Sequence, residues 1–400
     1  MSKLFPLKGT IQPYAWGGSN FIAELINYKG TENIIAEYWL GGHVNAPSTI
    51  STADGDKKLD QFLRENPSHL GSYVKDTFNR LPYLFKVLDV KDMLSIQVHP
   101  TKKQAEIGFE EENERGVDPG ASYRNFKDDN HKPEIMVALS EFWLLHGFLP
   151  ESELLQVLRN NQEFNTLIPI FESQGYKGLY QSVMEQPQEA CNAQLKPLID
   201  RIVPQYKAGK LDKSSPDFWA ARAASTSENG ADIDKGIYSI YFFNIVKAEE
   251  GQAVFQDAGL PHAYLEGQNI ELMANSDNVL RGGLTPKHID IQALMEHVRF
   301  EATIPNKLNG ELDSNGLERV FKSPVKDFEL SKIELGSGQQ YNKNCDTIEI
   351  VLCMKGKVAV AEGSERCTLE KGASALLTSG ARYQISSESD AVLFKASVPS

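Results

Sequence analysis

Short hydrophobic runs bounded by polar turns dominate the N-terminal part of the chain. Residues 83–90 (YLFKVLDV) and 94–98 (LSIQV) are two such runs, and a polar turn separates them. Two further runs follow at 134–139 and 142–148. Runs of this length, rich in aromatic and branched residues, are typical of β-strands. We therefore expect residues 1–150 to be mostly strands and loops.

Hydrophobic residues recur at helical spacing in the segment 151–230. Leu154 and Leu158 lie on one helical face, and residues 188–206 continue the same spacing. The polar run 224–230 closes the segment. The spacing predicts a small helical insertion between two β-rich parts.

Strand-like sequence returns after this segment. The run 236–246 (GIYSIYFFNIV) predicts a strand, and residues 289–298 predict a helix. In the last eighty residues, short hydrophobic runs alternate with glycine-containing turns at a spacing of about ten residues, which is typical of a β-sandwich or jelly roll. No histidine follows His297, so we expect this terminal sheet to be structural rather than a metal site.

Length and composition limit the class of protein. Four hundred residues exceed what one hydrophobic core usually serves, so two or three domains are expected. The chain is 41% hydrophobic and 24% charged, which excludes an intrinsically disordered protein. Because 54 acidic residues outnumber 41 basic ones, the net charge is −13. A surface of this sign repels nucleic acid and anionic membranes, so we expect neither as a partner.

Nothing in the sequence indicates export or membrane insertion. The chain has no uncharged apolar stretch of about 18 residues. Its start, MSKLFPLKGT, lacks the apolar core of a secretory signal. The four cysteines form no CxxC pair. We therefore expect a cytoplasmic protein with free thiols.

Polar and apolar residues alternate between Ser95 and His99. In a strand, Ser95, Gln97 and His99 would share one face while the apolar residues between them face the core. Gln97 and His99 would then both reach one metal ion. A buried histidine with a structural hydrogen bond is the other interpretation of this pattern.

A carboxylate stands at the beginning of the next hydrophobic run. Glu134 starts the run, and Lys132 lies two residues before it. A buried carboxylate needs a compensating charge. Either a metal ion or an ordinary Lys132–Glu134 ion pair supplies that charge. Of the remaining histidines we connect only His131 with this group, because it adjoins Lys132.

Two glycine-containing segments later in the chain carry further candidates. A glycine-proline turn at 259–261 precedes His262 and Tyr264, as in cupin barrels that present a ligand at the barrel mouth. A hairpin with a buried aromatic residue is the alternative. Arg281 precedes two glycines, which allow a close approach of the backbone to an anion, although a solvated loop fits the same sequence.

The candidates together supply two imidazoles, one carboxylate and one amide. They are His99, His262, Glu134 and Gln97. This mixed set of nitrogen and oxygen donors suits zinc or another divalent transition ion better than calcium or magnesium, which take oxygen ligands.

Several motifs occur in one order along residues 14–287. They read YAWG at 14–17, AEYWLGGH at 36–43, FKVL at 85–88, LSIQVHP at 94–100, HKPE at 131–134, and the whole block 259–287. In these motifs the chain resembles the type I mannose-6-phosphate isomerase family. The resemblance implies an enzyme with one zinc per chain that interconverts mannose 6-phosphate and fructose 6-phosphate through a cis-enediol(ate). It also implies the metal ligands Gln97, His99, Glu134 and His262 and a catalytic Arg281.

Two short stretches depart from the family's usual pattern. Residues 44–48 (VNAPS) follow His43 where a proline and a basic residue are more usual. Thr101 follows His99-Pro100 in place of the commoner aspartate. Neither stretch contains a predicted ligand, and we expect the first to alter the pocket rim and the substrate tolerance.

The patterns and the resemblance together predict a mainly β protein. We expect two cupin-like jelly-roll domains with an inserted small helical domain. Residues 1–150 with 231–320 are expected to form the catalytic cupin-like domain. Residues 151–230 are expected to form the helical insertion, and residues 321–400 the C-terminal jelly roll.

The implied reaction moves a proton between C1 and C2 of the sugar, so it needs a base. We favour Lys132, because a lysine close to a cationic metal has a lowered pKa. Glu271 and Tyr264 compete for this role, and Asp277 with His99 is expected to assist ring opening. Contacts with the substrate and its phosphate are expected from Lys86, Ser95, Lys287 and Trp16.

A phosphosugar is the only partner that we expect, and the expected state is a monomer or weak homodimer. The implied activity would link glycolysis with mannose metabolism, including GDP-mannose biosynthesis. Two other functions stay open: a cupin-type isomerase or epimerase of another phosphorylated sugar, and a sugar-sensing protein without turnover. The presence of Lys132, Arg281 and all four ligands argues against the sensing protein.

Overall fold

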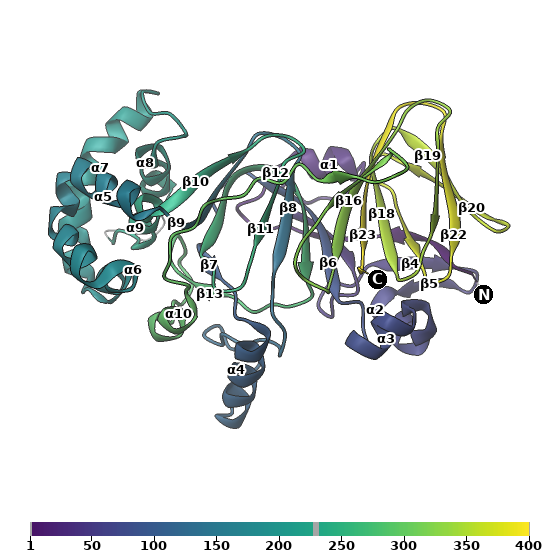
Figure 1. Cartoon of the computed structure of the whole chain (residues 1–400), viewed down its shortest axis with the longest axis horizontal. Coiled ribbons are helices and arrows are strands. Elements are labelled where there is room, and N and C mark those ends of the chain that lie inside the picture. Colours follow the sequence, from purple (N-terminus) through teal and green to yellow (C-terminus); the bar gives the residue numbers. More distant parts are fainter. Residues whose placement is uncertain (1, 227–231, 400) are drawn as a thin grey trace.

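The computed structural model describes residues 2–226 and 232–399. A helical part lies at one end of the molecule, a β-structure in the middle and a second β-structure at the other end (Figure 1). The protein is mainly sheet, as expected, and its strands pair in antiparallel fashion. Part of the polar run 224–230, and the boundary expected between residues 230 and 231, lie outside the described residues. The division into three domains stays a prediction.

The middle β-structure is a ten-stranded sheet that carries all the strands near the candidate ligands. Its strands are β2 (Thr10–Gln12), β3 (Glu37–Gly41), β6 (Tyr83–Val90), β7 (Gln97–Val98), β8 (Glu134–Ala138), β9 (Phe142–Phe148), β10 (Phe243–Ala248), β11 (Ala253–Gln256), β12 (His262–Ala274) and β13 (Leu280–Arg281). The strands expected at 83–90, 134–139 and 142–148 are confirmed as β6, β8 and β9. All three are buried along their whole length, which explains why apolar residues occupy both faces of each strand.

The long strand β12 serves two parts of this sheet. Its first residues pair with β9 and β7, and the residues from Gly267 onward pair with β6 and β8. The register shifts between Tyr264 and Glu266, and Gly267 has a φ of 124°. A Cβ atom at position 267 would lie 2.7 Å from the carbonyl oxygen of Glu141, so only glycine fits this bend.

The second β-structure consists of a nine-stranded and a four-stranded sheet. The larger sheet contains β1 (Leu4–Lys8), β4 (Thr49–Thr52), β5 (Gly55–Lys58), β14 (Glu311–Leu312), β15 (Glu318–Phe321), β16 (Glu329–Leu335), β18 (Glu349–Lys355), β21 (Ser374–Leu377) and β23 (Ala391–Ser397). The smaller sheet contains β17 (Gln340–Asn344), β19 (Lys357–Glu362), β20 (Glu365–Glu370) and β22 (Arg382–Ser387). The seven short strands expected in the last eighty residues are therefore confirmed. The N-terminal strand β1 pairs with β21, so the chain begins in the same sheet in which it ends (Figure 1).

Strand β6 joins the two β-structures through its two faces. Tyr83, Phe85 and Val87 pack in one apolar cluster with residues of the nine-stranded sheet, such as Ile350 and Phe394. The Tyr83 hydroxyl lies 3.2 Å from the carbonyl oxygens of Ile348 and Ala396, which satisfies its polar group in the core. The opposite face of β6 is thereby left to Lys86 and the candidate site.

The helical part follows β9 and contains the helices predicted over 151–230 together with one more. The predicted helices appear as α5 (Glu151–Asn160), the 3₁₀ turn η2 (Gln162–Leu167), α6 (Ile168–Glu185), α7 (Gln188–Lys207) and α8 (Pro216–Thr226), and the additional helix is α9 (Gly236–Phe242). The other helices are α1 (Phe21–Leu25), α2 (Leu59–Glu65), η1 (Pro67–Leu70), α3 (Ser72–Phe78), α4 (Lys102–Glu114) and α10 (Ile291–His297), the last of which confirms the helix expected over 289–298.

The strand predicted from Gly236 is wrong over its first seven residues. Residues Gly236–Phe242 form helix α9, and strand β10 begins only at Phe243. The Asp234 carboxylate accepts a hydrogen bond from the Gly236 amide at 2.7 Å, which satisfies a free donor where the helix begins. Every residue of α9 is buried, and the helix packs against α5 and α8. Burial on all sides removes the amphipathic spacing by which a helix is distinguished from a strand in the sequence.

The strand predicted over 94–98 is also shorter than expected. Only Gln97 and Val98 form β7, because the amides before them bond to different segments. The Leu94 amide donates to Tyr264 O at 2.9 Å, and the Ile96 amide donates to Gly283 O at 3.0 Å. The short strand still lies between β12 and β13, next to His262 and Arg281.

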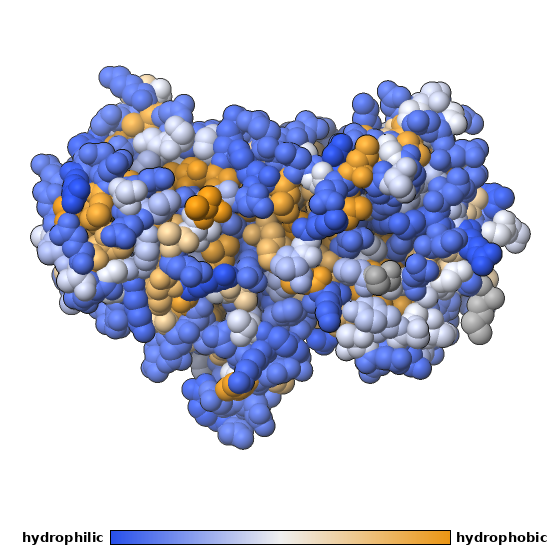
Figure 2. Space-filling model, viewed as in Figure 1, coloured by the Kyte–Doolittle hydropathy of each residue, from blue (hydrophilic) through white to orange (hydrophobic). Residues whose placement is uncertain are grey.

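Hydrophilic residues cover most of the face drawn in Figure 2, and hydrophobic side chains emerge between them in smaller groups. Across residues 2–226 and 232–399, no helix combines the length and the apolar character needed to span a membrane.

Candidate metal centre and active site

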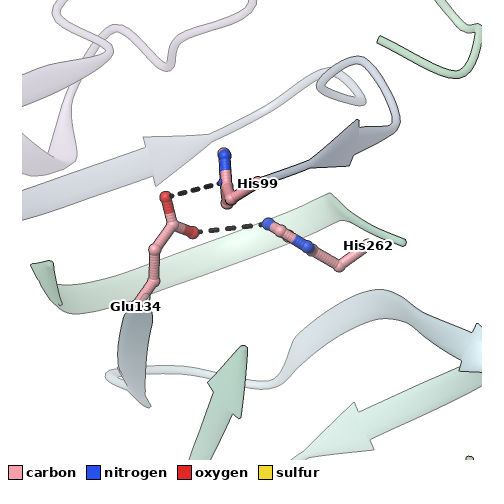
Figure 3. Close-up of side chains that lie close together, drawn as sticks. All are labelled: His99, Glu134 and His262. Atoms are coloured by element: carbon pink, nitrogen blue, oxygen red, sulfur yellow. Dashed lines mark ion pairs between the residues drawn. The ribbon is translucent and has the colours of Figure 1, made fainter. Parts of the chain in front are cut away.

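Three of the four predicted metal ligands converge in the middle β-structure. His99 follows β7, while Glu134 begins β8 and His262 begins β12 (Figure 3). His99 Nε2 lies 3.3 Å from Glu134 Oε1, and His262 Nε2 lies 3.4 Å from Glu134 Oε2. All three side chains are buried, and their possible ligand atoms lie within 4.8 Å of one another.

Main-chain carbonyls fix the orientation of both imidazoles. His99 Nδ1 lies 2.8 Å from Asn278 O, and His262 Nδ1 lies 2.9 Å from Leu260 O. A carbonyl only accepts hydrogen bonds, so Nδ1 of each ring carries a proton. In the neutral form of such a ring, Nε2 presents a lone pair toward the Glu134 carboxylate. Two imidazole Nε2 atoms and one carboxylate thus face one another, while the protein backbone binds Nδ1 of each imidazole. Metal ligands in proteins are arranged in this way.

The charges around this group favour the protonation states in which these residues bind a metal ion. Burial lowers the pKa of His99 to about 4, with a further contribution from the charge of Lys132. Burial alone would raise the pKa of Glu134, but Lys132 and His99 outweigh it and hold that pKa well below its usual range. At neutral pH the site therefore contains a neutral His99 and an ionised Glu134, the forms in which both residues bind metals.

Gln97 lies beside this group on β7. It pairs in register with His262 of β12 on one side and with Arg281 of β13 on the other. Residues directly opposite in antiparallel strands place their side chains on the same face. The register therefore puts Gln97 next to His262 and Arg281, where the sequence analysis expects the amide ligand and the catalytic cation.

Lys132 lies inside the candidate metal centre. Its Nζ is 2.5 Å from Glu134 Oε1 and 3.5 Å from His99 Nε2, and the side chain is buried. The ion pair considered in the sequence analysis is therefore present. It does not separate the two interpretations, because the same amine also lies among the candidate ligands.

A second group of charges centres on Lys86. Its Nζ lies 2.8 Å from Glu271 Oε2 and 3.6 Å from Glu37 Oε2. Burial lowers the pKa of Lys86, but the two carboxylates outweigh this effect and raise it above its usual value. Lys86 is therefore a permanent ammonium held by two carboxylates, and Glu37 is a site residue that the sequence analysis missed.

The two other candidate bases differ in their surroundings. Burial raises the pKa of Glu271 above its usual value, although Lys86 works in the opposite direction. Burial also raises the pKa of Tyr264 well above its usual value, with Glu271 as the next contribution. Within the part of the chain that the structure describes, the buried Tyr264 hydroxyl has no hydrogen-bond partner. A phenol of this kind stays protonated at neutral pH, which disfavours it as a base.

Asp277 lies at the rim of the site and pairs with His43. His43 Nε2 is 3.2 Å from Asp277 Oδ1, and Asn45 Nδ2 is 3.2 Å from Asp277 Oδ2. Burial would raise the pKa of Asp277, but the contacts with His43 outweigh it and lower the pKa. Asn45 belongs to the stretch 44–48 that departs from the usual family pattern, so this departure contacts a predicted site residue.

The other predicted contact residues differ in burial and surroundings. Arg281 is half-buried, and burial lowers its pKa. Lys287 is exposed, and partial desolvation together with the nearby charge of Arg281 lowers its pKa. Ser95 and Trp16 are half-buried, and Trp16 packs on the apolar cluster that contains Tyr264. Arg281 and Lys287 influence each other, whereas Lys86 pairs with Glu37 and Glu271 and lies close enough to Glu134 for that carboxylate to raise its pKa.

Two further histidines lie next to the segments that carry the site. His131 Nε2 lies 3.0 Å from both carboxylate oxygens of Asp327, so it connects the site segment to the terminal β-structure. His146, taken as structural from the sequence, pairs in register with His262. Burial and the neighbouring His262 lower its pKa to about 3. In β9, His146 and Leu145 lie on opposite faces of the strand. Because every residue of β9 is buried, the sequence of the strand does not show which of its faces turns toward the site.

Comparisons with known proteins agree with this architecture. Residues 4–151 match the family "Phosphomannose isomerase type I, catalytic domain". The chain is 35% identical over 378 residues to the mannose-6-phosphate isomerase of Escherichia coli (strain K12), a match that covers 93% of this chain and 94% of that protein. It is 32% identical over 429 residues to the mannose-6-phosphate isomerase of Homo sapiens, covering 98% of both chains.

A solved structure resembles the whole chain. It is the crystal structure of mannose 6-phosphate isomerase from Salmonella typhimurium bound to fructose 6-phosphate and zinc. The TM-score is 0.87 at 29% identity, and the match covers 100% of both chains. The fold, the buried group of candidate metal ligands and the similarity to known proteins together define the class of protein. It is an isomerase with a candidate metal site in an antiparallel sheet. The chain belongs to the type I phosphomannose isomerase family.

Proposed function

We propose that this protein is a zinc-dependent aldose–ketose isomerase that interconverts mannose 6-phosphate and fructose 6-phosphate. The observation that carries the proposal is the convergence of His99 Nε2, His262 Nε2 and the Glu134 carboxylate in a buried group. The similarity to isomerases of this name over nearly the whole chain supports the substrate pair.

The residues present fit a zinc ion. Two imidazole nitrogens with their protons on the far side, one ionised carboxylate and the neighbouring Gln97 amide form a mixed donor set. Gln97, His99, Glu134 and His262 would hold one zinc per chain. When bound, zinc acts as a Lewis acid that stabilises negative charge on a substrate oxygen.

The side chains of this protein supply the rest of the reaction. A base takes the proton from one of the carbons C1 and C2 and returns it to the other through a cis-enediol(ate). Lys132 has this role in our proposal because its amine lies among the candidate ligands. Glu271 is the second candidate, since its raised pKa makes it a stronger base than an ordinary carboxylate.

Cations around the centre would bind the anionic groups of the substrate. Arg281 stabilises the enediolate, and Lys287 beside it contacts the phosphate. Ser95 and Trp16 complete the substrate contacts. Because its amine already binds Glu271 and Glu37, Lys86 reaches a phosphate only by exchanging one of these partners. Asp277, ionised through its contact with His43, assists ring opening together with His99.

The remaining parts of the proposal concern the whole molecule. They comprise two cupin-like β-domains with a helical insertion, a cytoplasmic location and a role linking glycolysis with mannose metabolism. The absence of a nucleic-acid or membrane partner rests on the net charge of −13 and the charge balance of the chain.

A coupled assay with several hexose phosphates tests the function. The full chain should convert mannose 6-phosphate to fructose 6-phosphate, lose this activity after chelation and regain it with zinc. Conversion of another phosphosugar alone would favour the alternative isomerase or epimerase. Binding of mannose 6-phosphate without turnover would favour the sensing protein, and either result would contradict the proposal.

A further inference from the structure

Asn278 is a fully buried residue in the connection between β12 and β13. It contacts two parts of the candidate metal centre that lie far apart in the sequence. Its side chain binds the segment before Glu134, and its carbonyl binds His99.

The side-chain amide of Asn278 is saturated by the backbone of residues 127–130. Oδ1 accepts hydrogen bonds from the amides of Lys127 at 2.6 Å and Asp128 at 3.2 Å. Nδ2 donates to the carbonyls of Asp128 at 2.7 Å and Asn130 at 2.8 Å. Residues 127–130 form no helix or strand, so these bonds replace the partners that regular structure would supply.

The segment held in this way leads directly to Lys132 and Glu134. Two neighbouring bonds hold the same segment, because the Asp277 amide donates to Asp128 Oδ2 at 2.7 Å and Ser276 Oγ donates to Asn130 O at 3.1 Å. Pairing with Gln256 of β11 and Met273 of β12 holds Glu134 from one side, and the loop that contains Asn278 holds the segment that leads to it.

The carbonyl of Asn278 binds the other side of the centre. It accepts a hydrogen bond from His99 Nδ1 at 2.8 Å, which fixes the tautomer and turns Nε2 toward Glu134. Hydrogen bonds to the second nitrogen of a metal-binding histidine typically set metal affinity by a factor of about 10–100. A shift of the Asn278 backbone would thus move His99 and Glu134 relative to each other.

We propose that Asn278 is a positioning residue that sets the affinity of the centre for a divalent metal, by fixing His99 and the Glu134 segment at the same time. This role rests on the proposed metal centre and adds to it a residue that does not itself touch the metal or the substrate.

Zinc affinity of the full chain tests this role. The protein is stripped of metal and titrated with zinc in competition with a chromogenic chelator, at a temperature where each variant is folded. Asn278→Ala should bind zinc about 10–100-fold more weakly than the wild type. Asn278→Asp keeps the shape and the acceptor oxygen but loses the Nδ2 bonds to Asp128 and Asn130, so it should also weaken binding. It replaces the alanine variant if that does not fold.

Asn161→Ala is the matched control. Asn161 is also a buried amide, and its Nδ2 donates to Val157 O at 2.9 Å in the helical part, away from the ligands. This variant should lower the melting temperature and leave zinc affinity unchanged. A purely structural role of Asn278 would produce the same result, so wild-type zinc affinity in folded Asn278→Ala or Asn278→Asp overturns the proposal.

The histidine tautomers give a second measurement, made on the wild type itself. In ¹⁵N-histidine NMR spectra of the metal-free chain, His99 should carry its proton on Nδ1, and Asn278→Ala should give a mixture of tautomers. A wild-type His99 with its proton on Nε2 would overturn the role of Asn278. Failure of the wild type to bind zinc at all would instead remove the metal centre, and this role with it.

Discussion

Replacement of Arg281 by lysine tests whether this residue acts on the transition state. Strand pairing fixes its backbone, since the Gly282 amide donates to Ile96 O at 2.9 Å and the Ile96 amide donates to Gly283 O at 3.0 Å. Among the described residues, no carboxylate lies within 4.0 Å of the Arg281 guanidinium, so its charge is available to an anionic substrate. Arg281→Lys therefore changes the shape of the cation and keeps its positive charge.

The magnitude follows from the loss of one pre-positioned donor. Lysine keeps the charge but lacks the planar fork that makes two parallel hydrogen bonds. Removal of one such donor from a charge-stabilising site typically costs about 3–4 kcal/mol, which corresponds to a fall of about 100–1000-fold in kcat. The melting temperature should stay near that of the wild type, because the Arg281 side chain makes no hydrogen bond or ion pair to the residues that the structure describes.

Steady-state kinetics with mannose 6-phosphate measures this effect. The expected result is a low kcat, a KM that changes little, and unchanged zinc content. If Arg281 only holds the phosphate, the loss appears mainly in KM. Turnover that recovers at saturating substrate would refute the role in the transition state.

The remaining predictions address the metal, the proton transfer and the stability of the terminal β-structure. His262→Ala should lower both bound zinc and activity while circular dichroism stays native; full metal content in this variant would contradict its assignment as a ligand. Lys132→Met should abolish exchange of the substrate C2 proton with solvent, measured by NMR in deuterated buffer, whereas normal exchange would shift the role to Glu271. Burial would raise the pKa of Glu318, but Lys395, whose Nζ lies 2.6 Å from its carboxylate, outweighs it and lowers that pKa to about 2. Its stabilising contribution is therefore complete above the unfolded-state value of 4.5 and is lost as the pH falls toward 2, so Glu318→Gln should flatten the acid-unfolding curve in this range. Lys395→Met leaves buried carboxylates without their cation and should lower the free energy of unfolding by about 3–5 kcal/mol in urea titrations, and an unchanged midpoint would refute the importance of this ion pair.

Strands rich in apolar residues on both faces were predictable from the sequence, and the helix α9 was not. Strands β6 and β9 are seven or eight residues long and bounded by turns, so length and flanking residues identify them. The residues of α9 are equally apolar and aromatic, but the helix is buried among other helices, so its sequence has no polar face. Only the tertiary packing decides between helix and strand at such a position.

Local patterns made His99, Glu134 and His262 candidate ligands, and the family resemblance joined them into one predicted site, whereas the groups that orient them were not predictable. Gln97 and His99 alternate along a short strand, and Glu134 follows Lys132 at the beginning of another. The partners of the two imidazoles are main-chain carbonyls of Leu260 and Asn278, and a carbonyl has no residue-specific signal. Glu37 and His43 come from a distant segment, and only the pairing of β3 with β6 brings Glu37 to Lys86.

Zinc titration of the metal-stripped full chain shows whether turnover depends on the proposed metal centre, when the rate of conversion of mannose 6-phosphate to fructose 6-phosphate is measured at each zinc concentration. We expect no activity without metal, a linear rise with added zinc and saturation at one zinc per chain. Full activity of the metal-free chain, or a rate that does not respond to zinc, would contradict this expectation.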